Sequence, residues 1–384
     1  MRLLCTPLLM FALAVVSQAQ TQTKPTSAEL TPRPAVSAIL EAFDKYEVVG
    51  MPEAHALKDV DDFILALIRN PAFPEKVNDI AVECGNSLYQ PMLDRYIAGE
   101  QVPFSEVQKV WRNTTQPMCG TSGFFEQFFP LVRAINQKLP AGKRLRVLAG
   151  DPPIDWDQIK TEEDIRKSFV DRDASIASVM EKEVLSKHRR ALMLFGTFHL
   201  MHDSGPPGSA ISIYEKDYPN RTFVISNLAF FDLKPSTPSS NRFVDWPVPS
   251  LAVAKGTWLG ALDLSHFFPP GVFIDDNCKV TTDFAKEELK PMEELVDAFL
   301  YLGPTDLQLR EQVPADIVLD TKYMTESERR LALQGFPDDF TSEAFHERIV
   351  RTARNAIFTV PRPPDVNAMV QQCLDQKSRN STPQ

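Results

Sequence analysis

The stretch Tyr46-Glu47-Val48-Val49-Gly50-Met51-Pro52-Glu53-Ala54-His55 joins a short apolar run to a carboxylate and an imidazole. The run is typical of a buried strand, and it stops at Pro52. Glu53 and His55 therefore lie in the loop that follows a strand. At this spacing the carboxylate can orient the imidazole and balance its charge.

Helices and strands alternate on both sides of this stretch. Residues 36–43 carry apolar side chains at the spacing of an amphipathic helix, and residues 60–68 repeat that pattern up to Asn70-Pro71. The run 79–83 predicts the next strand. Together these segments form a strand-helix-strand unit.

Further apolar runs predict four more strands, at 145–150, 191–196, 222–226 and 298–302. Residues 88–139 are mostly helical in pattern, Thr161-Glu162-Glu163-Asp164 resembles a capping box, and another helix is expected over about 173–185. This alternation predicts an α/β fold. We expect a largely parallel sheet with helices on both faces, plus a mainly helical C-terminal extension.

Composition divides the chain into five segments. Residues 1–19 combine Arg2, an apolar run and small residues before a cleavage point after Ala19, which is typical of a secretory signal peptide. We therefore expect export, to the periplasm or the cell exterior. The other segments are a flexible lead-in (20–34), the α/β core with the site (35–232), a C-terminal part packing on the core (233–376) and a disordered tail (377–384).

Charge and hydropathy exclude two classes of partner. The formal net charge is -10, and the basic cluster Lys187-His188-Arg189-Arg190 is too isolated for a nucleic-acid surface. After the signal peptide, no run reaches the ~20 apolar residues of a membrane span. We expect a small-molecule or peptide substrate, and the sequence leaves the oligomeric state open.

Four cysteines remain once the signal peptide is removed: Cys84, Cys119, Cys278 and Cys373. Export permits disulfides, and three pairings are possible. None of the four has the spacing of a structural zinc site. Cys84 follows Glu83 in an apolar segment, and we interpret it as a small buried hydrophobe rather than a nucleophile.

Ionisable side chains follow four successive predicted strands. In an open parallel sheet, ligands bind beyond the carboxyl ends of the strands, where loops and helix N-termini converge. The residues at these ends are Glu53 and His55, Glu83, Asp151, and His199 with His202 shortly after. The chain holds six histidines, so two or three of them at strand ends favour a single site.

Each residue also has a plainer explanation when taken alone. Asp151 before Pro152-Pro153 fits a turn, and His202 fits a solvated loop. Arg172 and Asp173 have two interpretations: Asp173 caps the following helix, which we favour, or the two residues orient the carboxylates of the site.

The segments Pro52-Glu53-Ala54-His55, Ile80-Ala81-Val82-Glu83, Val147-Leu148-Ala149-Gly150-Asp151, Arg172-Asp173 and Phe195-Gly196-Thr197-Phe198-His199 occur in this order. Over roughly residues 45–200 the chain thereby resembles the erythromycin esterase/ChaN/Tiki superfamily. The resemblance implies an α/β sheet, and an activity of ester hydrolysis, metal-dependent peptide hydrolysis or haem binding. The tight spacing of Glu53 and His55 is that of the ChaN and Tiki branches.

These residues favour an exported hydrolase that cleaves an ester or amide bond at the carboxyl edge of the sheet. His55, oriented by Glu53 or Glu83, acts as general base on a water, while His199 polarises the substrate or the leaving group. Asp151 holds one of the imidazoles in its productive tautomer.

Three alternatives stay open. A divalent metal held by Glu53, His55, Glu83 and His199 would leave a position for water. Binding of haem or another metal ligand without turnover is the alternative that the ChaN resemblance implies. In the third, the scaffold has lost activity and serves as an interaction domain. A serine nucleophile is set aside, because no Gly-x-Ser-x-Gly elbow occurs.

Overall fold

The computed structural model describes residues 28–335, with gaps, together with residues 347, 350 and 366–380. The gaps are 54, 56, 169–170, 204, 206–207, 230–242, 268–271, 275–277 and 283–288. The predicted signal peptide, residues 20–27 of the predicted lead-in and residues 381–384 of the predicted tail lie outside the described residues.

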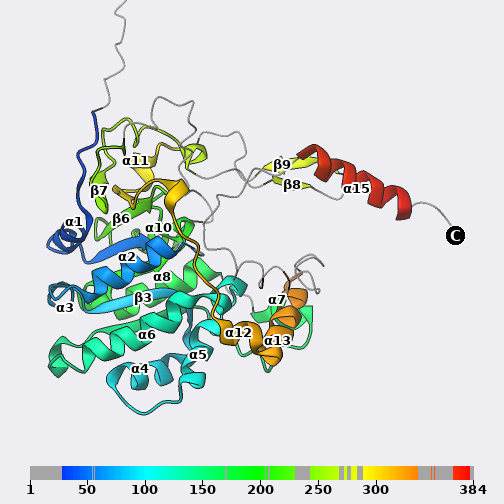
Figure 1. The fold of residues 1–384 in the computed structure, drawn as a ribbon, viewed down its shortest axis with the longest axis horizontal. Helices are drawn as coiled ribbons and strands as arrows, with labels where there is room; N and C mark the ends of the chain where they lie inside the picture. Colours follow the sequence, from blue (N-terminus) through cyan, green and yellow to red (C-terminus); the bar gives the residue numbers. More distant parts are fainter. Residues whose placement is uncertain are drawn as a thin grey trace, which may run out of the picture.

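An eight-stranded sheet forms the centre of the molecule, in the order β1-β7-β10-β6-β2-β5-β3-β4 (Figure 1). Neighbouring strands from β10 to β4 run parallel, whereas β7 is antiparallel to both β10 and β1. The strands are β1 (Arg33–Pro34), β2 (Val48–Pro52), β3 (Asp79–Asn86), β4 (Arg146–Asp151), β5 (Ala191–Phe195), β6 (Thr222–Asn227), β7 (Ser250–Val253) and β10 (Ala298–Tyr301).

Helices cover both faces of this sheet, so the prediction of an α/β fold with a largely parallel sheet is confirmed. One face carries α1 (Ala35–Ala42), α2 (Lys58–Arg69), α3 (Phe73–Lys76), α4 (Gln90–Ala98), α5 (Phe104–Arg112) and α6 (Gly123–Asn136). The other face carries α8 (Arg172–Glu183), α9 (Thr197–Leu200), α10 (Ala210–Tyr214) and α11 (Met292–Leu295).

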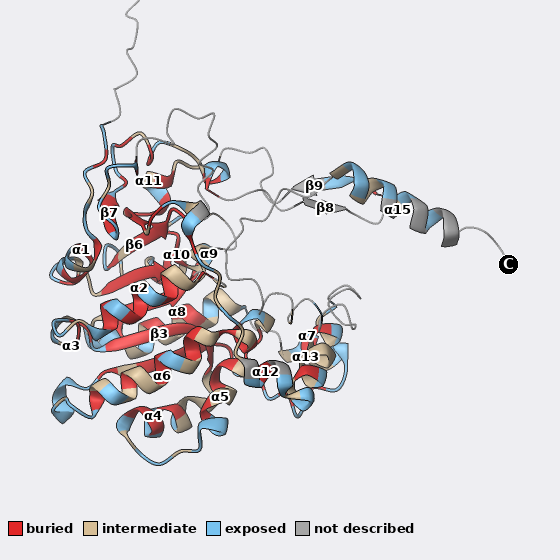
Figure 2. Cartoon of the chain, viewed as in Figure 1, coloured by how far each residue is buried: buried red, intermediate tan, exposed pale blue. Residues whose placement is uncertain are grey.

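Alternate side chains of the central strands point to opposite faces, and both faces are buried. In β2, Val49 and Met51 pack with α1 to α6, whereas Val48 packs with the helices of the other face. Figure 2 shows the central strands as buried and the outer surfaces of the helices as exposed. Fully burying one Val, Leu or Ile side chain stabilises a fold by roughly 1.5–3 kcal/mol, so these strands contribute strongly to stability.

The C-terminal part completes the sheet as well as packing on it. β10 matches the predicted late strand, but β7 was not predicted, and β1 lies at the end of the predicted lead-in. α12 (Ala315–Leu319) and α13 (Thr321–Leu333) follow, and the Tyr323 hydroxyl of α13 donates to the Arg112 carbonyl of α5 at 3.0 Å. α7 (Glu162–Ser168) lies near them in Figure 1.

The last described helix, α15 (Val366–Asn380), extends past Lys377, where the disordered tail was predicted to begin. It lies against β8 (Val272–Ile274), which pairs with β9 (Val280–Thr282). A disulfide joins Cys278 to Cys373 of α15. No helix in the described part of the chain is both long and apolar enough to cross a lipid bilayer.

Gly150 of β4 packs closely against Phe195 of β5. A Cβ atom on Gly150 would stand 2.5 Å from Cζ of the Phe195 ring, which is itself fully buried. We expect Gly150→Ala to lower the free energy of unfolding by about 1–3 kcal/mol, because the ring has no free space to enter. Urea unfolding measures this change.

Gly142→Ala is the matched control, since a Cβ atom there meets open space. Its free energy of unfolding should stay within about 0.5 kcal/mol of the wild-type value or rise slightly. Equal unfolding free energies for the two variants would contradict the close packing of β4 and β5.

Candidate active site

The ends of four adjacent strands, in the order β2, β5, β3 and β4, bring the predicted residues to one edge of the sheet. Glu53 follows β2, and its backbone N–H donates to the Phe195 carbonyl of β5 at 3.0 Å. Asp151 ends β4, and His199 lies in α9 directly after β5. Glu83 lies within β3, which continues to Asn86 through an irregular register after Val82, beyond the predicted end of that strand.

Glu83 is the centre of a hydrogen-bonded network at this edge. One carboxylate oxygen accepts from the backbone N–H of Gly196 at 2.6 Å, and the other accepts from Nη2 of Arg172 at 3.0 Å. Burial alone would raise the pKa of Glu83, but electrostatic interactions with His55, His199 and Arg172, together with the hydrogen bond from the Gly196 N–H, lower it to about 2. Glu83 is therefore a fixed carboxylate at neutral pH.

Arg172 joins Glu83 to Asp151. Its Nε donates to Asp151 at 2.9 Å, and Thr115 donates to the same carboxylate through its backbone N–H (2.6 Å) and its hydroxyl (2.8 Å). The interpretation of Asp151 as the partner of an imidazole was wrong. Asp151 is fully buried beyond the histidines, where it binds the guanidinium that orients Glu83 and His199.

Asp173 holds His199. Oδ1 of Asp173 lies 2.8 Å from Nδ1 of His199 and also accepts from the Ala210 N–H at 2.7 Å. Nε2 of His199 lies 3.3 Å from Nη1 of Arg172. Because a guanidinium only donates hydrogen bonds, Nε2 is the acceptor and the proton is on Nδ1.

The interpretation of Asp173 as a helix cap was wrong, and the alternative that we favoured less is the correct one. Asp171 caps α8, and its carboxylate accepts from the Ala174 N–H at 3.2 Å. Asp173, two residues further on, is thereby free to bind His199.

His55 forms the second carboxylate-histidine pair. Its Nδ1 lies 3.2 Å from Oε2 of Glu53, and the Glu53 side chain is only 1% exposed. Burial alone would lower the pKa of His55, but the carboxylates of Glu53, Glu83 and Glu311 raise it to about 9. His55 is therefore an imidazolium at neutral pH, which does not suit the general base that the sequence analysis assigned to it.

Two acidic residues near Glu53 were missed. Glu311 belongs to the C-terminal part and accepts from the Ser122 hydroxyl at 2.8 Å and the Phe124 N–H at 2.6 Å. Asp61 of α2 is buried, and burial together with the charges of Glu311 and Glu53 raises its pKa well above the ordinary value. Neither residue follows a strand, so the pattern of strand ends did not reveal them.

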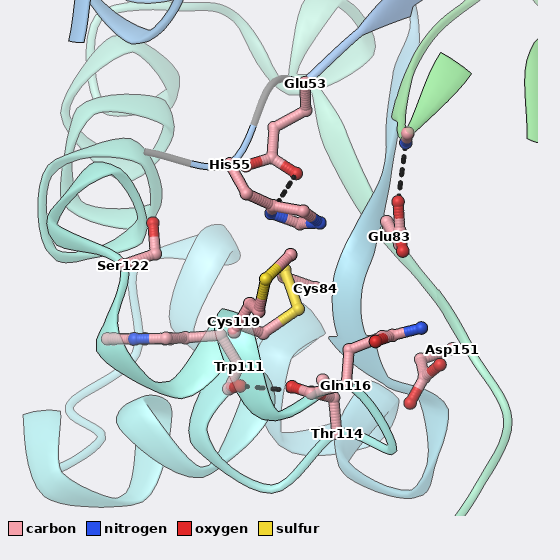
Figure 3. The surroundings of a disulfide bond; sticks show 12 residues. Glu53, His55, Glu83, Cys84, Trp111, Thr114, Gln116, Cys119, Ser122 and Asp151 are labelled. Atoms are coloured by element: carbon pink, nitrogen blue, oxygen red, sulfur yellow. Dashed lines mark hydrogen bonds and ion pairs between the residues drawn. A yellow bond between two sulfur atoms is a disulfide. The ribbon is translucent and has the colours of Figure 1, made fainter. Parts of the chain in front are cut away.

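The cysteine beside Glu83 is part of a disulfide. Cys84 pairs with Cys119, which lies between α5 and α6, and both residues are fully buried. Figure 3 shows the disulfide next to the ring of His55. The predicted burial of Cys84 is therefore confirmed, and the pairing that the sequence left open is Cys84 with Cys119.

His202 belongs to a different cluster. Its Nδ1 lies 2.9 Å from a carboxylate oxygen of Glu215, and its Nε2 lies 2.8 Å from Oδ2 of Asp297. Burial alone would lower the pKa of His202, but hydrogen bonds with Asp297 and Glu215 raise it to about 9. These contacts join the segment after α9 to α10 and β10, which is a structural role.

The donor atoms of Glu53, His55, Glu83 and His199 do not fit a shared metal ion. Both oxygens of Glu83 already accept hydrogen bonds, and both ring nitrogens of His199 have partners. The Arg172 guanidinium supplies the positive charge between these groups that a metal ion would bring. His199 is also a poor axial ligand for haem, because both of its ring nitrogens already have partners.

Among the comparisons with known proteins, the comparison with solved structures gave matches. No protein-family model and no curated protein sequence matches the chain. The solved structure of a protein from Bacillus cereus matches with a TM-score of 0.47 and 11% identity, over 74% of this chain and 97% of that one. A succinoglycan biosynthesis protein matches with a TM-score of 0.44 and 9% identity, over 71% of this chain and 94% of that one.

A mutant of erythromycin esterase EreC, in its open conformation, matches with a TM-score of 0.41 and 10% identity, over 71% of this chain and 95% of that one. Likenesses of this extent carry no argument about activity, substrate or metal.

The pKa of His55 is open to direct measurement. We expect its ring proton resonances to titrate near pH 9 in NMR spectra of the histidines, because three carboxylates stabilise the imidazolium. Glu53→Gln removes the nearest carboxylate and should shift the midpoint downward by at least about one pH unit. The exposed His188, titrated in the same spectra, is the internal control, and an unchanged His55 midpoint in the variant would rule out the pairing with Glu53.

Proposed function

We propose that this protein is a hydrolase of ester or amide bonds that uses His199 as general base and His55 as general acid. The observation that carries the proposal is the pair of histidines at one sheet edge, each bound to its own carboxylate, with the ionised Glu83 close to both. General acid–base catalysis needs one group that accepts a proton and another that donates one.

The tautomer of His199 makes it the base. Asp173 binds the Nδ1 proton, so Nε2 carries the lone pair, which accepts from Nη1 of Arg172 at 3.3 Å. In a hydrolysis, the attacking water would replace Arg172 as the partner of Nε2 and transfer its proton there. The imidazolium that forms is stabilised by Asp173 and by Glu83, whose Oε1 lies 3.6 Å from Nε2.

The raised pKa of His55 makes it the acid. It carries a proton at neutral pH and is 20% exposed, so a bound substrate can reach it. Donation of that proton to the departing oxygen or nitrogen would complete the cleavage. The sequence analysis had made His55 the general base and had placed His199 at the substrate or leaving group. In this proposal His199 is the base, and His55 acts on the leaving group.

Hydrolysis of a panel of chromogenic esters and anilides tests the proposal. We expect His199→Gln and Asp173→Asn each to lower kcat/KM by about 10²–10⁴-fold. The first variant removes the base, and the second removes the carboxylate that keeps the proton on Nδ1 of His199. His188→Gln is the control, since its side chain is 75% exposed and lies at the other end of the strands. The proposal fails if the wild-type enzyme cleaves nothing in the panel, or if the variants cleave it equally well.

The pH profile of the same reaction separates the two roles. Because His55 must be protonated, kcat/KM should fall as the pH rises through about 9. Glu53→Gln should move this alkaline limb to lower pH, whereas a limb that stays in place would exclude His55 as the acid.

We also propose that the protein works outside the cytoplasm, on a small-molecule or peptide substrate. The predicted signal peptide supports export, and so do the Cys84–Cys119 and Cys278–Cys373 disulfides, because such bonds persist in oxidising compartments. N-terminal sequencing of the mature protein, with Gln20 expected as the first residue, checks the export. Recovery of chains that begin at Met1 would contradict it.

A further inference from the structure

The Cys84–Cys119 disulfide places a sulfur atom beside Glu53 and His55. One potential ligand atom from each of Glu53, His55 and Cys84 lies within 4.8 Å of the others. In the described part of the chain this is the one group of three or more such residues that meets this spacing. Figure 3 shows the ring of His55 between the Glu53 carboxylate and the sulfur atoms.

The three side chains carry the donor atoms that zinc prefers. In a tetrahedral zinc site, metal-ligand distances of 2.0–2.3 Å place neighbouring ligand atoms about 3.3–3.7 Å apart. The ligand atoms therefore need to approach one another by at most about 1.5 Å. Three protein ligands would leave one position open for water.

Glu53 belongs to this set as a buried anion. The residue is 3% exposed, and its Oε2 lies 3.2 Å from Nδ1 of His55, an ion-pair contact whose geometry falls short of a good hydrogen bond. A divalent cation can replace the imidazolium as the counter-charge of this carboxylate.

The disulfide keeps this set from binding metal. A thiolate is the ligand that holds zinc, whereas a disulfide sulfur has no negative charge. We propose that reduction of Cys84–Cys119 by a dithiol converts Glu53, His55 and Cys84 into a site for zinc or a similar divalent cation. The site differs from the set Glu53, His55, Glu83 and His199, and it does not depend on the proposed hydrolysis.

The chemistry balances in two steps. The S–S bond breaks and takes up two electrons and two protons from the dithiol, which becomes a disulfide. On metal binding, the Cys84 thiol and the His55 ring each give a proton to the solvent, which leaves a thiolate and a neutral imidazole as ligands.

Two serine variants separate the sulfur atoms without a reductant. Cys119→Ser leaves Cys84 as a free thiol, and Cys84→Ser leaves Cys119 as a free thiol. Both variants lose the same disulfide, so their free energies of unfolding should fall by similar amounts. Cobalt(II) serves as the probe, because a cobalt-thiolate bond gives a charge-transfer absorption. We expect Cys119→Ser to bind one equivalent with that absorption, at least about 100-fold more tightly than Cys84→Ser.

Further substitutions in the Cys119→Ser background define the ligands. Glu53→Gln and His55→Gln should each weaken cobalt binding by at least about 10-fold, whereas His199→Gln should leave it unchanged. Equal binding by the two cysteine variants, or a cobalt complex without the thiolate absorption, would overturn the proposal. Loss of affinity in His199→Gln would overturn this choice of ligands.

The Cys278→Ser/Cys373→Ser protein provides a second measurement that needs no change at Cys84 or Cys119. It should bind cobalt tightly after treatment with a phosphine, which reduces disulfides without chelating metal, and not before treatment. Circular dichroism confirms that the reduced protein remains folded. Absence of binding by the folded, reduced protein would contradict the proposal.

Discussion

The guanidinium of Arg172 lies between two buried carboxylates that would repel each other without it. Glu83 and Asp151 are 3% and 0% exposed, and Arg172 gives each a separate N–H donor. An unpaired buried ion costs several kcal/mol, so these two acids and the arginine form one electrostatic unit. The third donor of Arg172 reaches His199, which ties the base of the proposed reaction to the same unit.

This unit depends on how α8 begins. Asp171 caps the helix, Arg172 binds Asp151, and Asp173 binds the ring of His199. Three consecutive residues thus make three different contacts. The partial positive charge at the helix N-terminus also favours the nearby carboxylates. The two histidines then differ in their surroundings. His55 lies among acids, whereas His199 lies between an acid and a cation, and such a difference is how a site separates its acid from its base.

The positions of the strands could be predicted because both faces of the sheet are buried, which gives uninterrupted apolar runs. The same runs located Glu53, Glu83, Asp151 and His199, because the carboxyl ends of parallel strands meet. The antiparallel strand β7 was missed, since its four residues follow a Pro- and Ser-rich stretch that predicts a loop. Most of the hydrogen-bond, ion-pair and disulfide partners of individual side chains could not be predicted from the sequence.

Asp171 and Asp173 are both suitable caps by residue type, and only the φ and ψ angles at the helix start decide between them. Glu311 reaches the site through tertiary contacts of the C-terminal part, which leave no local pattern in the sequence. The same holds for Cys119 as partner of Cys84, because sequence alone does not fix which cysteines pair.

The strand order also constrains how a growing chain can fold. β5 lies between β2 and β3, and β10 pairs with the outer edge of β6. Strands from the first part of the chain therefore pair with strands that come much later in the sequence. β2 and β3 follow each other in the sequence but not in the sheet, so the edges that face each other are paired only once β5 (Ala191–Phe195) lies between them. Such pairings close long loops before they gain contacts, and folds that depend on them form slowly.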